Sequence, residues 1–202
     1  MDNIEKELEA GRAVILPTET VYGIFAKALD QEAVDYIYEL KRRPRDKALN
    51  LNVADEKTIR IYSKNQPSYL TKLIHSFLPG PLTIILQANE KVPNWIHSGL
   101  DTVGFRIPAH PKTLDLIRKF GPLVGPSANL SGHASGTKYR AIVSEFDQVV
   151  PGIEDDDFLT GQDSTILDIS SSKSRILRQG SITKADLLAQ VPELSFEEDE
   201  LP

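Results

Sequence analysis

Apolar and polar residues recur along the chain with two different periods. Short apolar runs bounded by glycine, proline, asparagine or serine predict strands, and they fall at residues 12–16, 48–53, 82–88, 102–107, 122–127, 164–170 and 175–180. Segments with apolar residues three or four positions apart predict helices, and they fall at residues 3–10, 31–42, 55–62, 67–77, 111–120, 137–145 and 183–190. Because strands and helices interleave, the pattern predicts an α/β fold with a mixed sheet. The nearly all-apolar run "LTIIL" predicts a central strand that is buried on both faces.

Length and composition narrow the class of protein. The chain has 202 residues, 40% of them hydrophobic and 26% charged, which suits one domain with an ample core. We expect this domain at residues 1–190 and a disordered acidic tail at 191–202. The absence of cysteine excludes disulfides and thiol chemistry. The charged start "MDNIEKELEAGR" is unlike a signal peptide, and no stretch approaches a membrane span, so we expect a cytoplasmic protein.

Positive charge is concentrated in one place. The net charge is −6, which argues against a surface built mainly to bind a long polyanion, yet "KRRPRDK" at 41–47 is densely basic. Lys41 continues the apolar face of the preceding helix, on which Ile37 lies, so we expect its side chain to point inward. Pro44 ends that helix. Arg45 fits a solvated cation near the helix end equally well.

Polar residues of one chemical kind follow several apolar runs. "AVIL" leads into "PTETVYG" at 17–23, "PLVG" leads into "PSANLSG" at 126–132, and Arg106 and Arg178 lie in two other predicted strands. Each of these features alone has an ordinary explanation as a turn, a helix cap or a solvated arginine. Open α/β sheets bind ligands in a crevice at strand ends, so their recurrence favours a ligand site.

Familiar catalytic motifs are missing from the sequence. There is no P-loop, no G-x-G-x-x-G and no H-E-x-x-H. Residues 125–129 approach the G-x-S-x-G nucleophile elbow, but the second glycine is absent and no histidine and acid pattern supports it. The 4 histidines lack metal-ligand spacing, so we predict no metal site made of protein side chains.

The motifs "PTETVYG", "KRRPRDKAL", "PGPLT", "VGFRIPAHP", "GPSANLSG", "STILD" and "ILRQG", in this order, resemble the YrdC/TsaC family of threonylcarbamoyl-AMP synthases. The resemblance spans about residues 5–190 and implies a twisted, open sheet around a deep, positively lined cavity, in the short form with a single YrdC-like domain. The implied reaction converts L-threonine, bicarbonate or CO2, and ATP into threonylcarbamoyl-AMP and pyrophosphate, with Mg2+ accompanying ATP. The implied downstream partner is a TsaD/TsaB/TsaE-like complex that transfers the threonylcarbamoyl group to tRNA next to the anticodon.

The resemblance also implies roles for single residues. Lys41 and Arg43, the K-x-R element, are implied to be catalytic and to face the triphosphate. The implied ATP-binding residues are Lys41, Arg43, Lys47, Thr102, Ser127, Thr137 and Arg178. The implied threonine-binding residues are Thr20, Asn52, Arg106, Asn129 and Ser164. The chain departs from the family pattern at Asn52, where some relatives carry histidine, and in "DKAL", which lacks the usual proline or glycine before leucine.

Two other functions fit parts of the sequence. An RNA-binding module would use the same basic residues, but the net charge and the lack of exposed aromatic runs argue against it, so we expect weak tRNA binding at most. A hydrolase of related adenylates is a further alternative. The residues suit the synthase, because phosphoryl-type transfer depends mainly on positioning and on cations, and no protein nucleophile is needed.

Overall fold

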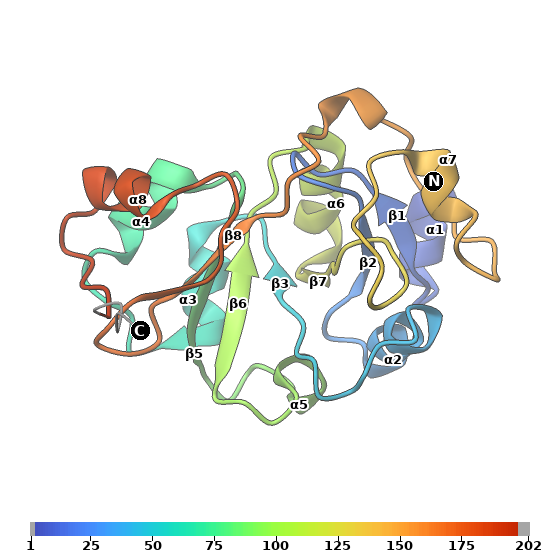
Figure 1. Cartoon of the computed structure of the whole chain (residues 1–202). Coiled ribbons are helices and arrows are strands. Elements are labelled where there is room, and N and C mark those ends of the chain that lie inside the picture. The colour runs from blue at the N-terminus through green and yellow to red at the C-terminus, as the bar shows by residue number, and fades with distance from the viewer. Residues whose placement is uncertain (1–2, 198–202) are drawn as a thin grey trace.

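The computed structural model describes residues 3–197 and contains one open, mixed sheet with helices on both sides (Figure 1). Across the sheet the strands are β1 (Val14–Leu16), β2 (Gly23–Lys27), β7 (Leu123–Val124), β3 (Leu51–Asn52), β6 (Thr102–Arg106), β5 (Leu82–Ala88), β8 (Thr165–Asp168) and β9 (Arg175–Arg178), and β4 (Ser63–Lys64) pairs with β5. The pairs β3–β6 and β5–β8 are parallel, and the other pairs are antiparallel. The predicted α/β class with an open mixed sheet is therefore confirmed.

The helices flank this sheet and also cover its ends. They are α1 (Asn3–Glu9), α2 (Gln31–Leu40), α3 (Glu56–Tyr62), α4 (Leu70–Phe77), α5 (Asn94–His97), α6 (Pro111–Phe120), α7 (Tyr139–Val143) and α8 (Lys184–Gln190), with a short 3-10 helix, η1 (Asp156–Phe158). In Figure 1, α4 and α8 lie at one end of the molecule, and α1, α2 and α7 lie at the other.

Alternate residues of the first strand pack into two different cores. Val14 and Leu16 belong to a small apolar cluster that includes Leu8 of α1 and Ile117 of α6. Ile15, between them, belongs to the large core on the opposite face. A strand covered on both faces has no polar side to present, which explains the all-apolar "VIL" sequence.

Helix α2 carries the basic cluster at its end. Asp30 caps the helix by accepting a hydrogen bond from the Ala33 amide at 3.2 Å. The helix ends at Leu40, and Arg42 then adopts a left-handed conformation with φ of 49°, which turns the chain before Pro44. Lys41 is 1% exposed, so the inward orientation predicted from the apolar periodicity is confirmed.

The structure corrects several predicted boundaries. β2, β4 and α5 were not predicted, and the strand expected at 122–127 contains only Leu123–Val124. β2 was missed because it starts at Gly23, directly after a segment that reads as a turn. That glycine is required, because a Cβ there would lie 2.5 Å from Cε2 of Phe25.

The predicted disordered tail is wrong for residues 191–197. Val191 is 0% and Leu194 5% exposed, and both belong to the large core. The Ser174 amide donates to the Ser195 carbonyl oxygen at 2.7 Å, and the Glu197 amide donates to the Ser174 carbonyl oxygen at 3.2 Å. These apolar residues and backbone bonds outweigh the acidic composition that suggested disorder. The rest of the predicted tail, from 198 on, lies outside the described residues.

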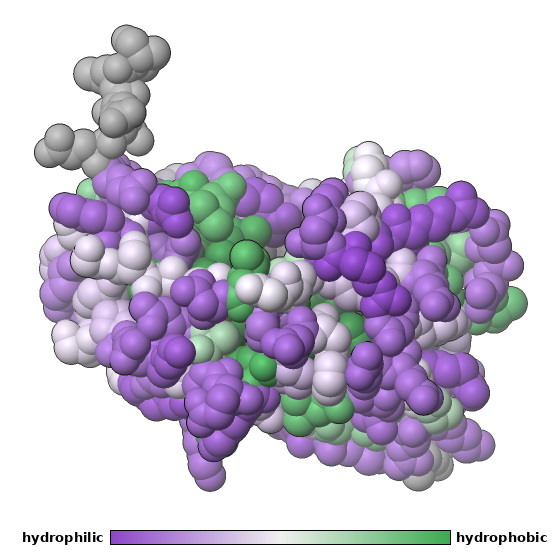
Figure 2. All heavy atoms as spheres, turned by 90° about the horizontal axis from the view of Figure 1, so that it is seen from below, coloured by the Kyte–Doolittle hydropathy of each residue, from purple (hydrophilic) through white to green (hydrophobic). Residues whose placement is uncertain are grey.

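The surface is largely polar. Figure 2 shows polar residues over most of the face that it presents, with apolar residues gathered mainly near the middle. Within residues 3–197, the structure has no helix that is both long and apolar enough to span a membrane.

Candidate active site

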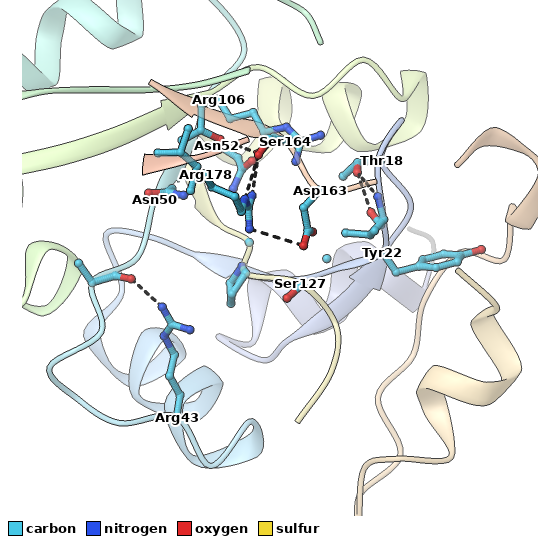
Figure 3. Close-up of a pocket in the computed structure, with 17 residues that line it drawn as sticks. Thr18, Tyr22, Arg43, Asn50, Asn52, Arg106, Ser127, Asp163, Ser164 and Arg178 are labelled. Carbon is cyan, nitrogen blue, oxygen red and sulfur yellow. Dashed lines mark hydrogen bonds and ion pairs between the residues drawn. The ribbon is translucent and has the colours of Figure 1, made fainter. Parts of the chain in front are cut away.

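A cavity of about 270 Å³ lies between the β1–β2–β7 side of the sheet and the β5–β8–β9 side (Figure 3). Segments far apart in the sequence line it, and the predicted site residues among them are Arg43, Asn52, Arg106, Ser127, Ser164 and Arg178. Three of these residues are arginines, and one carboxylate, that of Asp163, is found among the described lining residues. The cavity is therefore suited to an anionic ligand.

Arg106 lies at the end of β6, where the parallel register places it beside Asn52 of β3. Its Nη2 donates to Oε1 of Glu19 at 2.6 Å and to the Thr20 hydroxyl at 2.7 Å. The second carboxylate oxygen of Glu19 accepts from the Ala109 amide at 2.8 Å. The Nε of Arg106 is buried and has no hydrogen-bond partner within residues 3–197. The guanidinium is therefore held in place on one side while Nε remains an unused donor.

Glu19 holds Arg106 in place, a role that its own segment of the sequence does not predict. The sequence predicts a ligand loop at "PTETVYG", and the family resemblance implies a role there for Thr20 alone. The available signal was the carboxylate placed between two threonines at a strand end. Its partner Arg106 lies 87 residues further on, so the pairing depends on the tertiary fold.

Arg178 reaches the cavity from the edge strand β9. Its Nε donates to the Ser164 carbonyl oxygen at 2.9 Å, its Nη2 donates to the Ser164 hydroxyl at 3.1 Å, and its Nη1 lies 3.6 Å from a carboxylate oxygen of Asp163. The Ser164 hydroxyl lies 3.0 Å from that of Thr83. These contacts join β5, β8 and β9 in one polar wall, which Figure 3 shows around Ser164.

Lys41 lies behind the cavity wall and is absent from the described lining. Its Nζ donates to the carbonyl oxygens of Ser127 and Asn129. The Asn129 side chain is also buried, and its Oδ1 has no partner among the described residues. Lys41 thus supports the backbone of the loop that presents Ser127 to the cavity.

The other members of the basic cluster differ in position. Arg43 lines the cavity and donates through Nη2 to the Ala48 carbonyl oxygen at 2.8 Å. Arg45 pairs with Asp35 and lies 4.7 Å from the centre of the Tyr38 ring. The solvated location considered for Arg45 is therefore confirmed, with 55% of its side chain exposed. Lys47 is exposed and does not line the cavity.

Two further predicted nucleotide contacts lie away from the lining. Thr102 is at the start of β6, roughly 13 Å along the strand from Arg106. Thr137 lies beside Gly161, outside the lining residues. Residues that do line the cavity but were not predicted include Thr18, Tyr22, Asn50, Thr83 and Asp163.

The acidic segment at 155–160 is hydrogen-bonded to the loop at 17–23. The Tyr22 hydroxyl donates to Oδ1 of Asp156 at 2.8 Å and accepts from the Asp155 amide at 2.8 Å. His110, which is 2% exposed, lies with Nε2 3.1 Å from Asp155. The Thr160 amide also donates to the Glu19 carbonyl oxygen at 3.0 Å. The contacts hold residues 155–160 against the loop that carries Thr20.

The described residues do not form a cluster of metal ligands. Within residues 3–197, the structure contains no group of three or more His, Cys, Asp or Glu side chains that could hold a metal ion.

Comparison with known proteins identifies the family. A sequence model of the Sua5/YciO/YrdC family, described as "Telomere recombination", matches residues 6–180. The chain belongs to this family.

Curated relatives with known names cover most of the chain. It is 36% identical to a threonylcarbamoyl-AMP synthase of Pyrococcus abyssi over 93% of its own length and 56% of the relative's length. It is 38% identical to the threonylcarbamoyl-AMP synthase of Bacillus subtilis, over 91% and 54% of the two chains. The chain therefore spans little more than half of these relatives. For a putative threonylcarbamoyl-AMP synthase of Methanocaldococcus jannaschii, at 36% identity, it covers 86% of the relative.

Solved structures agree with the fold. P. abyssi Sua5 in complex with L-threonine superposes with a TM-score of 0.88 at 35% identity, covering 96% of this chain and 57% of that one. E. coli YciO superposes with a TM-score of 0.77 at 22% identity, covering 88% and 87% of the two chains, which shows a shared fold.

Proposed function

We propose that the chain is a threonylcarbamoyl-AMP synthase, a nucleotidyltransferase that uses L-threonine, bicarbonate or CO2, and ATP. The observation that carries this proposal is the cavity in which Arg43, Arg106 and Arg178 converge with Ser127 and Ser164. The family membership and the threonine-bound structure of P. abyssi Sua5 support the same substrate.

The chemistry requires no covalent intermediate with the protein. The amine nitrogen of threonine attacks the carbon of CO2 and, after losing a proton, gives a carbamate. A carbamate oxygen then attacks the α-phosphorus of ATP, the bond to the oxygen that bridges to the β-phosphorus breaks, and pyrophosphate leaves. Negative charge develops on the pyrophosphate oxygens, and fixed cations lower the energy of that transition state.

The proposed residue roles divide between the two substrates. Arg106, beside Asn52 and bonded to Thr20, would bind threonine together with Ser164, and its planar fork suits the carboxylate. Asn129 lies outside the described lining, so its proposed contact with threonine requires the loop at 129–133 to approach the cavity. Arg43, Ser127 and Arg178 would bind ATP. Lys41 would act on the triphosphate from behind the loop at Ser127. Lys47, Thr102 and Thr137 lie outside the lining, so their proposed ATP contacts require the nucleotide to extend beyond the cavity or these residues to approach it.

Mg2+ would enter with ATP. Mg2+ is commonly held by one or two carboxylates together with substrate phosphates, and Asp163 is a carboxylate at the cavity beside Arg178. Such an ion would neutralise charge on the phosphate oxygens.

The product is an acyl-phosphate anhydride, which a second enzyme must use. We propose that a TsaD/TsaB/TsaE-like transferase complex moves the threonylcarbamoyl group to an adenosine of tRNA in the cytoplasm. The tRNA itself would bind the synthase weakly.

A reconstituted reaction tests the proposal. The protein is incubated with ATP, Mg2+, bicarbonate and threonine, and pyrophosphate and the adenylate are followed by mass spectrometry. We expect both products only when threonine and bicarbonate are present. Equal pyrophosphate release without threonine would contradict the proposal and indicate a plain ATPase.

Valine provides a matched substrate control, because it replaces the threonine hydroxyl by a methyl group of similar size. The buried Oδ1 of Asn129 has no partner among the described residues, and valine could not supply one, so we expect threonine to be strongly preferred. Equal use of valine would show that the pocket assignment is wrong.

A further inference from the structure

Lys41 is a buried cation without a direct carboxylate partner in the described structure. Its ammonium group contacts the carbonyl oxygens of Ser127 and Asn129. Burial, followed by the charge of Arg43, lowers the pKa of Lys41 to about 7, while the charge of Glu145 acts in the opposite direction. A buried ammonium group is costly unless nearby negative charge compensates it.

Glu145 contacts the same loop that Lys41 supports. Its Oε2 accepts from the Leu130 amide at 3.4 Å and lies 3.5 Å from Nδ1 of His133. The Asn129 side chain donates to the carbonyl oxygens of Leu130 and His133, both at 2.9 Å. The carboxylate of Glu145 and the amide of Asn129 therefore hold one loop, at 129–133, through its backbone.

The segment that follows Glu145 lies near α2, the helix that leads into Lys41, and its contacts there are at the surface. Arg42 pairs with Asp147 at 2.8 Å. The Tyr36 hydroxyl donates to Oε1 of Gln148 at 3.1 Å. Glu145 thus contacts the loop of Asn129, and the residues that follow it, Asp147 and Gln148, contact Arg42 and α2.

We propose that Glu145 is a positioning residue of the synthase site: it holds the loop at 129–133 and supplies the negative charge that keeps Lys41 an ammonium group. The catalytic part of this inference rests on the proposed function. The charged and titratable groups that act on this pair are Arg43, which opposes the charge of Lys41, and His133, which contacts Glu145.

The sign of the expected pH dependence follows from the lysine. Lys41 is charged below its pKa and loses its charge as pH rises through that value. Removing the negative charge of Glu145 must lower this pKa further, so the charge is lost at a lower pH. If Lys41 acts as a cation, synthesis declines over the same pH range.

Glu145→Gln tests the charge separately from the shape. Glutamine keeps an oxygen that can accept from the Leu130 amide, but it carries no charge. We expect the Lys41 Nζ titration, followed by NMR of lysine labelled with nitrogen-15 and assigned with Lys41→Arg, to shift to lower pH by on the order of half a unit. The alkaline limit of pyrophosphate release should shift in the same direction.

Two variants serve as controls. Asp147→Asn removes a charge from the same segment at a side chain that is 83% exposed, so the Lys41 titration should stay at its wild-type pH. Glu145→Asp keeps the charge with a shorter side chain, so its titration should stay near that of the wild type even where the rate falls.

An unchanged Lys41 titration in Glu145→Gln, or an equal shift in Asp147→Asn, overturns the inference. A loss of rate that is the same at every pH also overturns it, because it indicates a purely structural role. The NMR titration requires no synthase activity, so failure of the proposed function is distinguished from failure of this inference.

Discussion

Arg106 reaches the cavity with only part of its guanidinium in use. Glu19 and Thr20 occupy Nη2, and Nε has no partner within residues 3–197. A guanidinium that is already fixed on one side is suited to a carboxylate ligand, because little side-chain freedom is lost when the ligand binds.

Arg106→Lys should therefore weaken threonine binding. Lysine keeps the charge but cannot contact Glu19 and a ligand carboxylate with one planar group. We expect the KM for threonine to rise roughly 10- to 100-fold, as the loss of a charged hydrogen bond implies, with a smaller effect on the KM for ATP. Steady-state pyrophosphate release at varied threonine measures this effect. Arg118→Lys, in an exposed pair with Asp115, is the control. Equal KM values for threonine in the wild type and both variants would show that Arg106 does not bind threonine.

Lys41 and Arg45 belong to the same basic cluster, but the structure predicts a large effect for mutation of Lys41 and little effect for mutation of Arg45. Lys41→Met leaves the carbonyl oxygens of Ser127 and Asn129 without their donor, so it should lower the free energy of unfolding by about 1–3 kcal/mol. It should also reduce synthesis by about 10²-fold or more. From the sequence alone we would expect little change in stability, since an inward cation would touch only the ligand.

Arg45→Ala is the matched variant, because it removes an exposed ion pair with Asp35. Its free energy of unfolding should change by less than about 0.5 kcal/mol and its activity should be retained. Urea unfolding and the pyrophosphate assay measure both variants. Near-normal synthesis by Lys41→Met would mean that the triphosphate is bound elsewhere.

At the scale of elements, the contact between β8 and β9 sets the position of Arg178. Gly180, just after β9, lies close to the backbone that leads into β8: a Cβ on it would lie 2.7 Å from the carbonyl carbon of Ser164. Its amide donates to the Thr165 hydroxyl at 3.0 Å. Backbone atoms cannot move aside as a side-chain end can, so this glycine permits the close approach of the two segments.

Gly180→Ala should separate these segments and displace Arg178. We expect a loss of stability of about 1–3 kcal/mol and a larger rise in the KM for ATP than for threonine. Ser181→Ala, at the exposed neighbouring position, is the control. Thermal unfolding and nucleotide titrations measure both effects. A stable Gly180→Ala variant with an unchanged KM for ATP would contradict this explanation.

At the scale of the whole molecule, charge is balanced locally. Arg42 and Arg45 pair with Asp147 and Asp35, and Arg140 lies 3.4 Å from Glu154. With a net charge of −6, few cations remain to neutralise phosphates along a nucleic acid.

The protein should therefore bind tRNA weakly. We expect a dissociation constant above roughly 10⁻⁶ M at physiological salt, and a slope of log K against log salt that corresponds to fewer than about three phosphates. Filter binding between about 50 and 200 mM salt measures both quantities. Tight binding that survives physiological salt would favour the RNA-binding alternative.

Local patterns in the sequence were enough for the α/β class, most helices and the inward side of Lys41. Each depends on a period of two or 3.6 residues, which the backbone imposes on any segment. The family motifs likewise predicted roles for Arg43, Arg106, Ser127 and Arg178, and these residues line the cavity.

Only the tertiary structure decided which of these residues meet. The order and register of the strands bring Glu19 to Arg106 and Asp163 to Arg178, while Thr102 is left at the far end of its strand. The same holds for the end of the chain, whose acidic composition predicts disorder although Val191 and Leu194 are buried. Composition and periodicity describe a segment by itself, whereas burial and ion pairing depend on neighbours that are distant in the sequence.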